Sequence, residues 1–180
     1  MKSIDLKKIP DTIIQKNGNY CIPASIETMV KYHDSSNNLS QNDIMTLMKN
    51  GASNGQPSFN AAQYYVTPKL KPKFELIQII TDTYEDWEVN IKEQINSGNP
   101  IAVSTRNKDG YTVHIRVVVG FDDIKRIFRL FNPGVSASIF NTTKRKIERI
   151  IQSDYEDYPY DEAKKDWSKQ NGCRDQLIIK

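Results

Sequence analysis

A cysteine and a glutamine six residues apart are the side chains of this chain best suited to chemistry. The run QKNGNYCIPAS places Gln15 six residues ahead of Cys21. A thiolate can attack a carbonyl carbon, and an amide N–H can hold the oxyanion that this attack creates. A cysteine between apolar residues is more often an inert buried side chain, so the interpretation as a nucleophile depends on a base elsewhere in the chain.

The residues after Cys21 predict a helix that begins at the cysteine. Pro23 suits a first turn, where a backbone N–H would have no intrahelical partner. Apolar residues recur at helical spacing on one side, at Ile22, Ile26, Met29 and Val30. Because the aligned peptide dipoles favour negative charge at a helix start, we expect the pKa of the Cys21 thiol to be lowered.

Two histidines are available as the base of such a nucleophile, His33 and His114. His33 follows Cys21 on the same predicted helix, which places it about 18 Å away along the axis. His114 lies in the run YTVHIRVVVGFDD, whose β-branched and aromatic residues predict a strand. His114 is therefore the candidate base.

A second strand is predicted from Arg126 to Phe131, as the hairpin partner of the strand that holds His114. Symmetric pairing about Asp123 would place Asn132 directly opposite His114. Facing side chains in an antiparallel pair lie about 5 Å apart, so the Asn132 oxygen could accept a hydrogen bond from the imidazole. A register slip of one residue would turn Asn132 to the other face.

These motifs together resemble the papain-like cysteine peptidase superfamily. The resemblance rests on Gln15, on the CIPAS opening of a helix, on a histidine in a valine-rich strand that ends GFDD, and on the NPG that closes the next strand. Trp167 followed by the final LIIK also resembles the helix and last strand of such proteins. Within the superfamily, the similarity is to the branch that removes double-glycine leaders from bacteriocins, and to its free-standing relatives.

The resemblance implies a role for each matched residue. Cys21 would be the nucleophile, His114 the general base and then acid, Asn132 the group that orients His114, and Gln15 an oxyanion-hole donor beside the Cys21 amide. The activity implied is hydrolysis of a peptide or isopeptide bond through a thioester. Ile22 stands where these families have Gly or Trp, and its branched side chain is expected to narrow the cleft beside the nucleophile.

Two other classes of function remain open from the sequence. Transglutaminases and arylamine acetyltransferases are acyltransferases that also use Cys, His and an acid in this chain order, although they place Asp third and lack the preceding Gln. A papain-like fold can also be kept as a binding module without activity. Amine competition for the thioester would identify the first class, and an unreactive Cys21 would identify the second.

Composition bounds the remaining expectations. At 180 residues, the chain is expected to form a single domain over residues 1–180. The net charge of +3 gives no indication of nucleic-acid binding, and no apolar stretch approaches the about 20 residues of a membrane span. Scattered His and Cys predict neither metal nor cofactor. The expected partner is a peptide or protein substrate, the expected state is a monomer, and cytoplasmic and exported locations both stay open. Cys173 is interpreted as structural.

The order of elements predicts an α+β fold, with an N-terminal helical layer packed on an antiparallel β-sheet and the active site in the cleft between them. Helices are expected from Ser40, a capping residue, to Lys49 and around Trp87, and strands over 74–81 and 101–105. The basic run 144–149 is interpreted as the solvated face of a further helix. The Tyr-rich acidic stretch 154–162 is interpreted as a loop.

Overall fold

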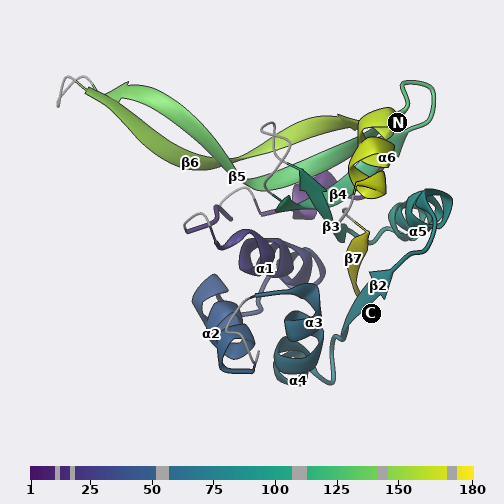
Figure 1. The fold of residues 1–180 in the computed structure, drawn as a ribbon. Coiled ribbons are helices and arrows are strands. Elements are labelled where there is room, and N and C mark those ends of the chain that lie inside the picture. The colour runs from purple at the N-terminus through teal and green to yellow at the C-terminus, as the bar shows by residue number, and fades with distance from the viewer. Residues whose placement is uncertain (11–12, 17–18, 52–56, 107–112, 142–145, 170–173) are drawn as a thin grey trace.

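A computed structural model gives the fold of the chain (Figure 1). It describes all residues except 11–12, 17–18, 52–56, 107–112, 142–145 and 170–173. For residues 135–141 and 146–153 it describes the backbone alone. The helices are η1 (Leu6–Lys8), α1 (Cys21–His33), α2 (Gln41–Gly51), α3 (Phe59–Ala61), the π-helix η2 (Ala62–Val66), α4 (Thr67–Leu70), α5 (Tyr84–Asn96) and α6 (Tyr160–Ser168). The strands are β1 (Lys2–Ser3), β2 (Leu76–Ile80), β3 (Ile101–Arg106), β4 (Val113–Asp122), β5 (Ile127–Asn141), β6 (Lys146–Pro159) and β7 (Asp175–Ile179).

The strands form one seven-stranded sheet in the order β2-β7-β3-β4-β5-β6, with β1 added beside β4. Every pairing among these described strands is antiparallel. β5 and β6 continue beyond the rest of the sheet as a long two-stranded ribbon that projects away from the helices (Figure 1). The α+β architecture expected from the sequence is therefore confirmed.

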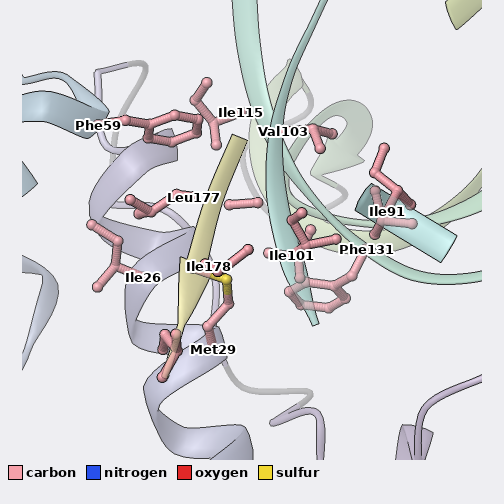
Figure 2. Close-up of a cluster of buried hydrophobic side chains, with 14 of the residues drawn as sticks. Ile26, Met29, Phe59, Ile91, Ile101, Val103, Ile115, Phe131, Leu177 and Ile178 are labelled. Carbon is pink, nitrogen blue, oxygen red and sulfur yellow. The ribbon is translucent and has the colours of Figure 1, made fainter. Parts of the chain in front are cut away.

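Helix α1 is the central helix, and its side chains are buried on nearly every side from Ile22 to Val30. Figure 2 shows Ile26 and Met29 of α1 beside Leu177 and Ile178 of β7. Burial of such aliphatic side chains contributes about 1.5–3 kcal/mol each. The core thus fixes the position of α1 against the sheet, and with it the position of Cys21.

Local sequence signals explain the ends of the other predicted helices. In α2, the hydroxyl of Ser40 accepts a bond from the Asp43 amide at 3.3 Å, and the Asp43 carboxylate accepts from the Ser40 amide at 3.0 Å. These reciprocal bonds are a capping box. Helix α5 ends before Gly98, whose φ of +81° lies in the left-handed region that glycine adopts without strain.

Two predicted elements are wrong. The basic run 144–149 is not helical where it is described: its backbone from Lys146 onward belongs to β6, paired along β5. The stretch 154–162 is not a solvated loop, because β6 continues to Pro159, α6 begins at Tyr160, and Tyr158 and Tyr160 are buried. No helix among the described residues has the length and apolar character needed to cross a membrane.

Candidate active site

Cys21 is the first residue of α1, and its thiol is free and half-buried. The preceding Tyr20 provides no side-chain cap, although its carbonyl accepts the first helical bond from the Ala24 amide at 2.9 Å. The amides of Cys21 and Ile22 therefore stay available to the sulfur. A third amide, from Ile115 of β4, also points at the sulfur.

The pKa of the Cys21 thiol is raised above its ordinary value, contrary to the expectation for a helix start. Burial is the largest cause, because it removes the water that would solvate a thiolate. The amides of Ile115, Ile22 and Cys21 and the positive charge of Arg116 lower the pKa, but less than burial raises it. The resting group at neutral pH is therefore a thiol, and it needs a base.

His114 and Asn132 are in direct contact, with 2.8 Å between Nε2 of the imidazole and Oδ1 of the amide. Both side chains are buried. Burial is the main reason that the pKa of His114 is lowered, and the charge of Arg116 lowers it further. The hydrogen bond to Asn132 and the charge of Glu156 act in the opposite direction. A lowered pKa keeps the imidazole neutral near pH 7, which is the form that accepts a proton.

The register that we expected between His114 and Asn132 is wrong, although the contact forms. Strand β4 pairs with β5 through Val117 opposite Phe131, which is two residues out of step with the predicted pairing. Asn132 therefore lies diagonally from His114. A diagonal neighbour on the same face of a sheet is still within reach of a long side chain.

Gln15 is buried next to the register shift that follows Asn132 in β5. Strand β5 continues through the NPG sequence to Asn141, so the expectation that this sequence closes the strand is wrong. The Gln15 amide donates to the carbonyl oxygen of Pro133 at 2.8 Å. Gly134 lies so close that a Cβ added to it would overlap the side-chain amide of Gln15. The Gly134 amide in turn donates to Oδ1 of Asn132 at 3.0 Å. The NPG sequence thus holds Gln15 on one side and Asn132 on the other.

The backbone on either side of Gln15 is held by one side chain that sequence analysis missed, Gln41 of α2. Nε2 of Gln41 donates to the Ile14 carbonyl at 3.0 Å, and Oε1 accepts from the Lys16 amide at 3.1 Å. Nε2 also donates to Glu27 of α1 at 3.0 Å. The side-chain amide of Gln41 thereby bonds to one backbone carbonyl and one backbone N–H of this segment, as a neighbouring strand would.

Glu156 of β6 and Arg116 of β4 complete the surroundings of Asn132, and neither was singled out from the sequence. Nδ2 of Asn132 donates to Oε1 of Glu156 at 2.9 Å, and Nε of Arg116 donates to Oε2 at 2.9 Å. Alternation along the predicted strand could have placed Arg116 on the face of His114. Glu156 gave no such signal, because its segment was interpreted as a loop.

The structure thus gathers three of the predicted site residues directly. Gln15, His114 and Asn132 lie around residues 132–134 of β5, and the Cys21 sulfur faces the Ile115 amide, one peptide bond from His114. His33 lies at the far end of α1, where its ring contacts Phe74 and Tyr32. Of the two histidines, His114 is therefore the one beside the cysteine.

A scan against protein-family models matches residues 10–165 of this chain to the Peptidase_C39 like family. The chain belongs to that family. A search of the curated proteins found no match. Membership establishes the papain-like relationship that the sequence motifs indicated, and it suggests a cysteine peptidase. The narrower double-glycine leader branch stays a prediction.

In this member of the Peptidase_C39 like family, the side chain of Ile22 is buried in the hydrophobic core. The expectation that Ile22 narrows the cleft beside Cys21 stays a prediction. Cys173 lies outside the described residues, so its interpretation as structural stays a prediction. No group of three or more His, Cys, Asp or Glu side chains within the described ranges could hold a metal ion.

Proposed function

We propose that this protein is a cysteine peptidase that hydrolyses a peptide or isopeptide bond through a thioester on Cys21. The observation that carries the proposal is the 2.8 Å contact between His114 and Asn132, on the strand whose next amide, that of Ile115, points at the Cys21 sulfur. A thiol, a neutral imidazole and an amide oxygen in this order are the parts of a cysteine nucleophile with its base.

The first half of the reaction forms the thioester. His114 takes the thiol proton on Nδ1, because Nε2 is engaged by Asn132. The Cys21 sulfur bonds to the substrate carbonyl carbon, and the carbonyl oxygen becomes an oxyanion. When the C–N bond breaks, His114 returns the proton to the leaving amine.

The second half releases the acyl product. Water attacks the thioester carbon, and His114 takes one of its protons. The C–S bond then breaks, the acyl group leaves as a carboxylic acid, and the proton returns to sulfur. No oxidant or cofactor is needed to balance these steps.

The oxyanion would be held by the side-chain amide of Gln15 and the backbone amide of Cys21. Two observations support this role. Pro133 and Gln41 bond to the backbone of residues 14–16, and the side chain of Gln15 is buried against Gly134. Removal of one oxyanion donor typically costs about 100-fold to 1000-fold in kcat.

The test is cleavage of a synthetic peptide library, with the products identified by mass spectrometry. The wild-type protein should generate new carboxyl termini, Cys21→Ala should generate none, and Cys173→Ala should behave as the wild type does. Cleavage of the same bonds at an unchanged rate by Cys21→Ala would exclude the mechanism.

The same substrate separates hydrolysis from acyl transfer. The thioester would be formed in the presence of increasing hydroxylamine or a primary amine, and the ratio of hydroxamate or amide to free acid would be measured. A peptidase should yield mainly acid at low amine concentration. Amide as the main product under those conditions would instead identify an acyltransferase.

A further inference from the structure

Glu156 contacts neither of the two groups proposed to react, Cys21 and His114, yet it is bonded to the residue that contacts the base. Its carboxylate lies between two donors, Nδ2 of Asn132 on β5 and Nε of Arg116 on β4, each at 2.9 Å. Three neighbouring strands thus contribute to one network. Arg116 is buried and also donates to Oγ1 of Thr105 on β3.

The ionised carboxylate determines which way the Asn132 amide faces. A carboxylate can only accept hydrogen bonds, so the part of the amide that faces Glu156 must be the NH₂ group. The opposite part must then be the carbonyl oxygen. The Gly134 amide provides an independent check, because this N–H donor points at that same oxygen at 3.0 Å.

The orientation of Asn132 in turn determines which nitrogen of His114 carries the proton. Oδ1 of Asn132 can only accept, so Nε2 of His114 must be the N–H donor in the 2.8 Å contact. In a neutral imidazole, the other nitrogen, Nδ1, then has the free lone pair. Nδ1 is the nitrogen that the proposed mechanism uses to take the thiol proton.

Arg116 makes this arrangement stable. The guanidinium donates to Oε2 of Glu156 at 2.9 Å, and this leaves Oε1 to accept from the Asn132 amide at 2.9 Å. A charge-assisted bond of this kind holds the carboxylate in one place. Arg116 also lies two residues from His114 on the same face of β4, and its charge lowers the pKa of His114 while the charge of Glu156 acts in the opposite direction.

We propose that Glu156 is a positioning residue, which fixes the Nε2-protonated tautomer of His114 through the orientation of Asn132. The importance of Glu156 for catalysis rests on the proposed function. The effect of Glu156 on the tautomer of His114 does not. The two are therefore tested by separate measurements.

The tautomer can be read without any substrate. In protein labelled with ¹⁵N-histidine, long-range ¹H–¹⁵N spectra distinguish a protonated ring nitrogen from a bare one, and His33→Asn assigns the two histidines. Above the pKa of His114, the wild type should show a protonated Nε2 and a bare Nδ1. A protonated Nδ1 in the wild type would overturn the proposal without any variant of Glu156.

Glu156→Gln tests the cause. The variant keeps the size of the side chain but has one acceptor atom for two donors, so Asn132 and Arg116 can no longer both be satisfied. We expect a mixture of His114 tautomers and a lower pKa of His114, because the negative charge of Glu156, which raises that pKa, is lost. With a cleavable substrate, kcat should fall by up to about 100-fold while KM changes little.

Glu162→Gln is the matched control, since Glu162 lines the same cavity of about 210 Å³ as Glu156 and Arg116. It should leave the tautomer, the pKa of His114 and kcat unchanged. Unchanged spectra in Glu156→Gln would overturn the proposal. If Cys21→Ala keeps its activity but the spectra change as expected, the positioning role stands and only the proposed function fails.

Discussion

His114 and Asn132 share a face of the sheet because of a β-bulge at Val119. Near the turn, Gly120 pairs with Arg129, but the next pair along is Val118 with Leu130, so Val119 is the extra residue. Continuing the register of the turn would have placed Asn132 opposite Val117, on the other face from His114. The bulge shifts the register by one residue and restores the contact.

Gly134→Ala is expected to displace the side chain of Gln15. A Cβ at this position would overlap the Gln15 amide, and Gly134 has no positive φ that alanine would strain to adopt. Overpacking of this kind costs about 1–3 kcal/mol, and a displaced oxyanion donor should lower kcat/KM by about 100-fold. Urea unfolding and steady-state kinetics measure the two effects.

A double-mutant cycle with Gln15→Ala gives this prediction its control. Once the Gln15 side chain is absent, alanine at position 134 has room, so the second change should cost nothing further in stability or rate. Gly98→Ala serves as a comparison, because Gly98 has positive φ and no atom near its Cβ position. Gly98→Ala should lower the stability of the fold and leave kcat/KM unchanged. Additive losses from Gly134→Ala and Gln15→Ala would contradict the steric explanation.

Gln41→Met should loosen the segment that carries Gln15. Methionine has a similar volume, but it cannot bond to the Ile14 carbonyl or the Lys16 amide, which Gln41 now satisfies. Loss of such bonds at a buried site costs about 1–3 kcal/mol. The rate should fall as well, since Gln15 is no longer held, with most of the change in kcat.

Gln63→Met is the matched control for that experiment. Oε1 of Gln63 in η2 accepts a bond from the Gln78 amide of β2 at 2.6 Å, and this bond does not involve the segment that carries Gln15. The variant also removes a bond between a side-chain amide and the backbone, so it should lower stability. Its kcat should not change. A kcat that falls equally in both variants would show that general loosening, and not Gln41, accounts for the effect.

Local patterns predicted α1 and the strands that hold the site, but long-range pairing decided the parts that were wrong. The spacing of Ile147, Ile150 and Ile151 is compatible with a helix, yet the backbone of this segment pairs with β5 as a strand. Such pairing depends on a partner strand and is not visible in a short window of sequence. Glu156 was missed for the same reason.

The candidate site shows a similar division between what is local and what is not. Gln15, Cys21, His114 and Asn132 were chosen as candidates by residue type and spacing, whereas the pKa of Cys21 was predicted in the wrong direction. A helix start can be read from sequence, but the burial of its first residue depends on what packs over it. Burial proved to be the larger effect.

The raised pKa of Cys21 predicts that its alkylation keeps accelerating at alkaline pH. Only the thiolate reacts with iodoacetamide, and below the pKa its fraction rises about tenfold per pH unit. Because burial raises the pKa above the ordinary value of 9.0, the rate should still be rising at pH 9.

The measurement uses Cys173→Ala, which removes the second thiol, so mass spectrometry of the intact protein follows the alkylation of Cys21 alone. In Arg116→Met, the rise of the Cys21 alkylation rate with pH should shift to still higher pH, because the charge of Arg116 lowers the pKa of Cys21. A plateau below pH 8 would instead mean that a thiolate–imidazolium pair of Cys21 and His114 already exists at neutral pH.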